Sequence, residues 1–197
     1  AHAQFMHESG HSEIAHAPED MVIFSKPSTS VIGPDDPIVI PSYSNDMNFE
    51  PEVAVIMGRI AKNVPVEKAM DYVLGFTCVN DVTLRDLQGL DPMWTRAKGF
   101  DTSCPLGPWI QTELDWKDAK ISFTLNGEDV PMASGTTANL IHGIPEQIAA
   151  ISSFSTLLPG DVIMTGTPNA SGHLDPGDEP IVHVAGIGSL RNVVVRG

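Results

Sequence analysis

Short apolar runs alternate along the chain with prolines, glycines and other turn residues. Runs of this kind are typical of buried β-strands, because strands are short and Gly and Pro punctuate them. The strands that we expect from this pattern lie at 21–27, 36–42, 53–57, 75–79, 109–110, 121–125, 161–165, 181–184 and 190–195. A hairpin turn is expected at Asn126-Gly127, because both central residues of a type I′ turn need positive φ.

Helical patterns are few and short by comparison. Residues 66–72 form one candidate, and residues 145–153 form the longest, with Pro145 in its first turn. Many short strands, few helices and 16 prolines predict a β-rich α+β fold. The regular alternation of helices and strands that marks a doubly wound fold is absent from the sequence.

The first twenty residues differ from the rest of the chain. They hold four of the seven histidines and have no apolar period. A segment with so little to bury is typical of a loop. We therefore divide the chain into a mobile N-terminal segment or lid at 1–20 and one folded domain at 21–197.

Composition and charge exclude several classes of protein. The formal net charge is −14 with 11 Lys and Arg residues, which argues against nucleic acid and anionic lipid as partners. Apolar runs are too short to cross a membrane, and no basic region precedes an apolar one as in a signal peptide. Cys78 and Cys104 lie in apolar surroundings and form no CxxC pair, so we expect buried free thiols and a cytoplasmic location.

The first candidate site is the pair Glu50 and Glu52. In an extended chain, residues i and i+2 project to the same face, so the two carboxylates point the same way. They stand at the edge of an apolar run, where a bound cation would relieve their repulsion. A solvated surface pair is the alternative. Pro51 cannot donate to a sheet, which places this segment at an edge or at a strand entry.

The second candidate site begins at Asp81, directly after the buried run 75–79. A short helix is expected next, with Arg85 and Gln88 on one face at i and i+3. The alternative is that Asp81 is a helix N-cap and that Arg85 and Asp86 form a surface pair.

Two loops complete the candidates. Lys98 lies in a Gly- and Pro-rich segment, from which its ammonium could meet a carboxylate or an enolate. Residues 158–168 form a turn, a buried strand and a loop of small residues that ends at Thr167-Pro168, whose N–H groups and hydroxyls could hold an anion. Each of these signals is ambiguous by itself.

Taken together and in order, the motifs resemble the catalytic domain of the fumarylacetoacetate hydrolase family. The matching segments are FEPEVAVIMG, GFTCVNDVTLRDLQ, WTRAKGFDTSCPLGPWI, NGE, TLLPGDVIMTGTP and GIGSLRN, and the resemblance covers roughly residues 20–197. It implies that family's mixed β-sandwich roll with few short helices.

The resemblance also implies roles for individual residues. A site with hard oxygen ligands favours Mg²⁺, with Mn²⁺ or Ca²⁺ as substitutes, and disfavours zinc. The implied residues are Glu50, Glu52 and Asp81 for the metal, Lys98 for catalysis, and Arg85, Gln88 and Thr167 for substrate binding.

The N-terminal segment departs from the family's pattern. Members commonly carry a His on the lid, with a Glu one helical turn later, to activate water or move a proton. His2 matches the start of that motif, but the residue three positions on is Phe5. Glu8 is then the candidate acid, and His7 is a rival for the histidine.

The function implied is an enzyme that acts on a small 2-oxo acid: the 2-oxo carboxylate chelates the metal, and the metal stabilises an enolate. The first interpretation is a hydrolase that cleaves a C–C bond of acylpyruvate-type 2,4-dioxo acids. The second is an oxaloacetate decarboxylase, or an isomerase, decarboxylase or hydratase of an unsaturated 2-oxo acid from aromatic catabolism. A non-catalytic binding protein is the third, although Lys98 and all three carboxylates are present. The family further implies a homodimer or a higher even oligomer.

Overall fold

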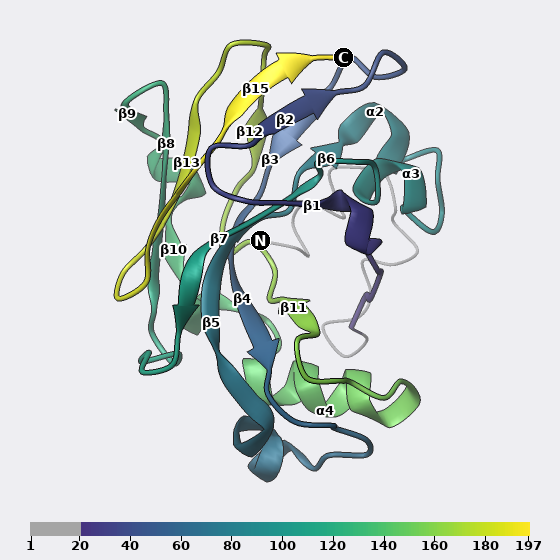
Figure 1. Cartoon of the computed structure of the whole chain (residues 1–197), viewed down its shortest axis with the longest axis vertical. Coiled ribbons are helices and arrows are strands. Elements are labelled where there is room, and N and C mark those ends of the chain that lie inside the picture. The colour runs from purple at the N-terminus through teal and green to yellow at the C-terminus, as the bar shows by residue number, and fades with distance from the viewer. Residues whose placement is uncertain (1–20) are drawn as a thin grey trace.

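The computed structural model describes residues 21–197 and is rich in strands, as the apolar pattern predicts (Figure 1). The larger sheet has the order β1-β7-β5-β4-β11, and its neighbours are antiparallel except β1 and β7. Its strands are β1 (Val31–Ile32), β4 (Pro51–Met57), β5 (Val73–Asn80), β7 (Cys104–Gln111) and β11 (Val162–Met164). Every residue of β4 is buried, and the strand lies between β5 and β11 in the sheet.

A second antiparallel sheet packs against the first. It has the order β10-β8-β13-β14, with β9 paired to β8, and comprises β8 (Lys120–Leu125), β9 (Glu128–Asp129), β10 (Gly135–Thr136), β13 (Pro180–Val184) and β14 (Gly188–Arg191). Asn126 and Gly127 have φ of 55° and 83°, so the turn between β8 and β9 is the one expected. The stacked rings of Phe49 and Phe123, 4.0 Å apart, lie in the core between the layers.

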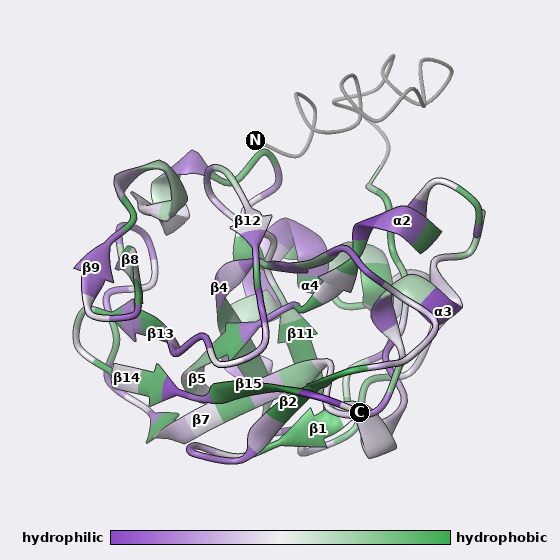
Figure 2. Cartoon of the chain, turned by 90° about the horizontal axis from the view of Figure 1, so that it is seen from above, coloured by the Kyte–Doolittle hydropathy of each residue, from purple (hydrophilic) through white to green (hydrophobic). Residues whose placement is uncertain are grey.

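Two small sheets complete the roll. One has the order β12-β3-β6, formed by β3 (Met47–Phe49), β6 (Thr83–Leu84) and β12 (Gly172–His173); the other pairs β2 (Pro37–Ile40) in parallel with β15 (Val193–Arg196). In Figure 2 the strands β2 and β11 are largely hydrophobic, whereas β9 at the rim is hydrophilic. The fold class expected from the sequence, a β-rich roll with few short helices, is confirmed.

The helices are short and lie outside the two large sheets. The longest, α4 (Ile144–Phe154), begins with a proline in its first turn and packs against the 3-10 helix η2 (Val66–Tyr72). At the other end of the molecule, α2 (Arg85–Gln88) and α3 (Thr95–Lys98) contact each other (Figure 1). The remaining 3-10 turns are η1 (Ser28–Ser30), η3 (Pro131–Ala133) and η4 (Thr137–Asn139).

Two sequence-based expectations fail in detail. Residues 21–27 form no strand, because the Lys26 ammonium and the Phe24 ring of this segment hold it against the 81–104 region instead of a sheet partner. The strand expected at 190–195 is broken at Asn192, whose side chain is buried and donates to the carbonyls of Gly33 and Asp36. The chain therefore leaves one sheet after β14 and enters another at β15.

Other features agree with the sequence. Cys78 and Cys104 are both buried and free. No helix in the described part of the chain is long and apolar enough to cross a membrane. Trp109 is 58% exposed, whereas Trp94 is buried beside Phe24.

Candidate metal centre

The pairing of β4 with β5 brings Glu50 and Asp81 face to face. Pro51 pairs with Asn80 in this ladder, so Glu50 and Asp81 are the next residues along the two strands. The Asp81 N–H donates to the Glu50 carbonyl at 2.9 Å, and the Glu50 N–H donates to the side chain of Asn80 at 2.8 Å. Pro51 opens β4, where its missing N–H costs no ladder bond.

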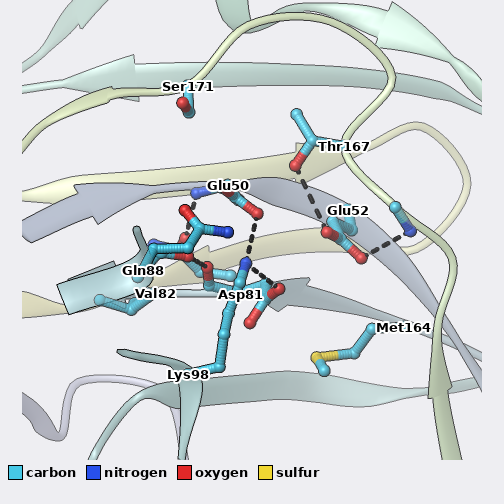
Figure 3. A network of polar contacts seen from close by, with 12 residues as sticks. Glu50, Glu52, Asp81, Val82, Gln88, Lys98, Met164, Thr167 and Ser171 are labelled. Carbon is cyan, nitrogen blue, oxygen red and sulfur yellow. Dashed lines mark hydrogen bonds and ion pairs between the residues drawn. The ribbon is translucent and has the colours of Figure 1, made fainter. Parts of the chain in front are cut away.

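Glu52 lies two residues along β4 and is buried. Its Oε2 accepts the N–H of Gly166 at 2.8 Å, and its Oε1 accepts from the Thr167 hydroxyl at 3.3 Å (Figure 3). Gly166 has φ of +99°, a conformation that a side chain would disfavour, and it follows the buried Thr165 after β11. The loop of small residues thus holds Glu52 in place.

The three carboxylates of Glu50, Glu52 and Asp81 form one cluster, with an oxygen of each within 4.8 Å of the others. Asp81 does not cap a helix: α2 begins at Arg85, and Leu84 occupies its N-cap position with no side-chain hydrogen bond. Burial, and then the charges of Asp81 and Glu50, raise the pKa of Glu52 to about 8. A buried carboxyl with a pKa raised this far is typical of a site in which a bound cation neutralises the clustered negative charges.

Lys98 stands against two of these carboxylates. Its Nζ donates to Asp81 Oδ2 at 2.6 Å and to Glu50 Oε2 at 2.7 Å, and only 3% of its side chain is exposed. Burial acts to lower the pKa of Lys98, but Asp81 and Glu50 outweigh it and hold the pKa above its usual value. The ammonium form is therefore the resident one.

Arg85 and Gln88 lie on one face of α2, as their spacing predicts. The Arg85 guanidinium donates to Gln88 Oε1 at 2.5 Å and to Glu50 Oε1 at 2.6 Å. It also donates to the hydroxyl of Ser171, on the loop that precedes β12. The guanidinium thus connects the carboxylate cluster to a second loop.

Two residues of the site, Lys26 and Ser171, were not predicted from the sequence. Lys26 Nζ lies 2.8 Å from Asp81 Oδ1, with 4% of its side chain exposed, and donates to the carbonyls of Lys98 and Ser103. A lysine just before a proline in an apolar run was its only distinguishing feature. Ser171 had none.

The remaining sequence-based candidates, His2, His7 and Glu8, lie outside the residues that the structure describes. The roles assigned to the lid therefore stay predictions. The metal-binding and catalytic roles of the residues above stay predictions too, because the structure shows only their geometry.

The residues present fit a hard divalent cation. All three candidate ligands are carboxylates, the donors that Mg²⁺, Mn²⁺ and Ca²⁺ prefer. Both oxygens of Asp81 face an ammonium group, Oδ1 at 2.8 Å from Lys26 and Oδ2 at 2.6 Å from Lys98. Burial acts to raise the pKa of Asp81, but Lys26 and Lys98 outweigh it and hold the pKa low, so the carboxylate is ready to bind.

Comparison with known proteins places this geometry in a family. Residues 1–195 match the family described as fumarylacetoacetate (FAA) hydrolase, C-terminal. A 5-carboxymethyl-2-hydroxymuconate delta-isomerase from Mycobacterium smegmatis is 46% identical, with a TM-score of 0.88 over 92% of this chain and 71% of that one.

Two further relatives have names that differ in reaction. The mitochondrial oxaloacetate tautomerase Fahd2a of Rattus norvegicus is 39% identical over 90% of this chain, which spans 60% of that protein. A fumarylpyruvate hydrolase from Pseudomonas aeruginosa, solved with Mn²⁺ and pyruvate, is 28% identical, with a TM-score of 0.84 over 94% of this chain and 84% of that one. The relatives are thus enzymes of more than one reaction class.

Proposed function

Because the chain belongs to the fumarylacetoacetate hydrolase family, we propose that it is a divalent-metal-dependent enzyme that interconverts the keto and enol forms of a small 2-oxo acid. The observation that carries this proposal is the buried cluster of Glu50, Glu52 and Asp81 with the Lys98 ammonium against it. The isomerase and tautomerase names belong to relatives at 46% and 39% identity, and hydrolase names to relatives at 32% and 28%. We therefore place tautomerisation or isomerisation ahead of C–C hydrolysis, which the sequence alone favoured.

The three carboxylates would hold Mg²⁺, with Mn²⁺ or Ca²⁺ as substitutes. When bound, the ion supplies Lewis acidity to the keto oxygen of a 2-oxo carboxylate and so acidifies the neighbouring C–H. Thr167 and Gly166 keep Glu52 oriented through their hydrogen bonds to its carboxylate. Arg85, fixed by Gln88 and Glu50, offers a positive charge to the carboxylates of the substrate.

Lys98 is the residue to which we assign the proton transfer. Its raised pKa keeps a proton on Nζ, in a site from which water is largely excluded. In the direction from enol to keto, Lys98 would give this proton to C3, and the proton of the enol O–H would return to the amine. The net change is a tautomerisation, in which one C–H bond forms, one O–H bond breaks and every C–C bond stays intact.

The test measures the ultraviolet absorbance of the enol form of oxaloacetate and of related 2-oxo acids in the presence of Mg²⁺ or Mn²⁺. Release of pyruvate and of CO₂ is measured separately. We expect the enol signal to decay faster than in the buffer control with no matching release of pyruvate. Lys98→Met should abolish the acceleration and still bind Mn²⁺. Failure to convert any acid of the panel with either metal would rule out the proposal.

The second candidate is hydrolysis of acylpyruvate-type acids, which the likeness to the fumarylpyruvate hydrolase favours. This reaction needs a base that activates water, and His2 and Glu8 are the candidates. Release of pyruvate together with a carboxylic acid would support it. His2→Ala or Glu8→Ala should then lower kcat by roughly 10²–10⁴-fold, the usual range for a positioned acid or base, and leave Mn²⁺ affinity unchanged.

We also infer that the chain assembles as a homodimer or a higher even oligomer in the cytoplasm. Leu74, Trp109 and Ile110 expose 48%, 58% and 46% of their surface, and large exposed apolar side chains of this kind favour an interface. Sedimentation at micromolar concentration tests the assembly, and a monomer would contradict it.

A further inference from the structure

Ser171 and Arg85 meet at the outer side of the carboxylate cluster. One guanidinium nitrogen of Arg85, Nη2, donates both to Glu50 and to the Ser171 hydroxyl. The two residues come from α2 and from the loop before β12, and they are 86 residues apart in the chain. Figure 3 places Ser171 across from Gln88 and Glu50, on a separate segment.

The cations of the site differ in how far they are enclosed. The side chains of Lys98 and Lys26 are 3% and 4% exposed, and both are committed to Asp81. The side chain of Arg85 is 13% exposed, and Ser171 beside it is partly exposed. An anion that enters from solvent therefore meets Arg85 and Ser171 before it meets either lysine.

The loop that carries Ser171 is held at both ends. On one side, Thr167 binds Glu52, the Asn169 side chain donates to the Ser134 carbonyl, and the Ala170 N–H donates to the Met132 carbonyl. On the other side, Gly172 pairs with Phe49 so closely that a Cβ there would lie 2.7 Å from the Phe49 ring. The Ser171 hydroxyl is therefore presented from a fixed backbone.

The hydroxyl of Ser171 accepts from Arg85, which leaves its own hydrogen to donate elsewhere. No acceptor for it is found among residues 21–197. A hydroxyl polarised by a guanidinium is a stronger donor than an isolated one, and a carboxylate oxygen is the acceptor that gains most from it.

We propose that Ser171, with the charge of Arg85, forms a subsite for the second carboxylate of a 2-oxo dicarboxylate. This inference rests on the proposed function and specifies its substrate class. A dicarboxylate such as oxaloacetate satisfies both groups, whereas a 2-oxo acid that ends in an acyl group, such as 2,4-dioxopentanoate, brings only a neutral carbonyl. Ser171 is then a residue that determines specificity, through a hydrogen bond that only the dicarboxylate makes at full strength.

The test compares Ser171→Ala, Ser171→Thr and Ser134→Ala in the full chain with Mn²⁺. Oxaloacetate and 2,4-dioxopentanoate are measured as substrates or as competitive inhibitors, and oxalate is measured as a ligand that has no distal group. We expect Ser171→Ala to lower the affinity for oxaloacetate about 10-fold relative to that for 2,4-dioxopentanoate, which is the effect of losing one hydrogen bond to a charged group. Affinity for oxalate should not change. Ser171→Thr keeps the hydroxyl and should restore the preference, and Ser134→Ala should resemble the unaltered chain.

An equal loss for both acids in Ser171→Ala, or a loss of oxalate affinity, would overturn the subsite while leaving the proposed function in place. Failure of the unaltered chain to bind oxalate with Mn²⁺ would instead refute the proposed function, and the subsite with it. The two failures are therefore distinguishable in one set of measurements.

Discussion

Lys98 Nζ lies 2.6 Å from Oδ2 of Asp81, and the side chains of both residues are 3% exposed. A pair so enclosed contributes little net stability when intact, but the removal of one partner leaves a buried charge. Lys26 shares Asp81 from the other side. The effects of the two lysines on stability should therefore be separable by adding a metal ion.

For Lys98→Met we expect a loss of about 3 kcal/mol in the unfolding free energy of the metal-free protein, because Glu50 and Asp81 lose a buried cation. Saturating Mg²⁺ should recover much of this loss, since the ion replaces the missing charge. Urea denaturation with EDTA and with Mg²⁺ measures both values. The same deficit with and without Mg²⁺ would show that no ion binds near these carboxylates.

Lys26→Met should behave differently. Lys26 donates to the main-chain carbonyls of Val82, Lys98 and Ser103, and a metal ion held by the carboxylates would not replace those bonds. We expect a loss of about 3 kcal/mol that Mg²⁺ does not recover. Lys68→Met, at an exposed position, is the matched control and should be neutral. Recovery of Lys26→Met by Mg²⁺ would mean that its role is charge alone.

Binding of Mg²⁺ should release a proton near neutral pH. Burial and the neighbouring acids raise the pKa of Glu52 to about 8 from an ordinary value of 4.5, so at pH 7 the metal-free carboxyl carries a proton that a cation must displace. Calorimetry in buffers of different ionisation enthalpy should find about one proton released per ion at pH 7 and almost none near pH 9.5. Glu52→Gln should lose this pH dependence.

The same raised pKa fixes the direction of the stability change with pH. The folded chain holds the Glu52 proton more tightly than the unfolded chain does. Its contribution is therefore complete below about pH 4.5 and is lost as pH rises through 8. Metal-free protein should unfold more easily at pH 9 than at pH 6 in EDTA, and the difference between the two pH values should shrink in Glu52→Gln.

Gly75 tests the close pairing of β5 with β7. A Cβ at this position would lie 2.7 Å from both the carbonyl oxygen of Gln111 and the Cγ2 of Ile110. Gly75→Ala should therefore cost about 1–3 kcal/mol of unfolding free energy, as overpacking does. Gly89→Ala meets nothing within 4 Å and should be close to neutral. Equal stabilities for the two variants would contradict the pairing of these strands.

Much of the fold could be predicted from local signals. The apolar run at 53–57 and its neighbour at 75–79 became the centre of the larger sheet, and Asn126-Gly127 became the expected turn. The strand expected at 21–27 is absent, because the apolar residues of this segment do not pack in a sheet. Val22 and Ile23 are 37% and 41% exposed, while Phe24 packs edge-on against Trp94.

Some residues of the candidate site could be predicted from local spacing and others could not. Glu50 and Glu52 were predicted because they are two residues apart in an extended segment, and Arg85 and Gln88 because they are three residues apart on a helix. Lys26 and Ser171 enter the site only through tertiary contacts, with Asp81 and with Arg85, that leave no local pattern. Contacts of that kind could not be read from one sequence, because nothing near either residue distinguishes it from a surface lysine or a loop serine.

The most direct test of the central claim is a titration of the metal-free chain with Mn²⁺. Electron paramagnetic resonance measures the bound ion, and no substrate is present. We expect one ion per chain, and an affinity at least 100-fold weaker in Asp81→Asn and in Glu52→Gln, since each variant removes a charged ligand. Glu128→Gln, at an exposed position, should bind as the unaltered chain does. If Asp81→Asn and Glu52→Gln bind Mn²⁺ as tightly as the unaltered chain, the three carboxylates are not a metal site and the protein is not the metal-dependent enzyme proposed.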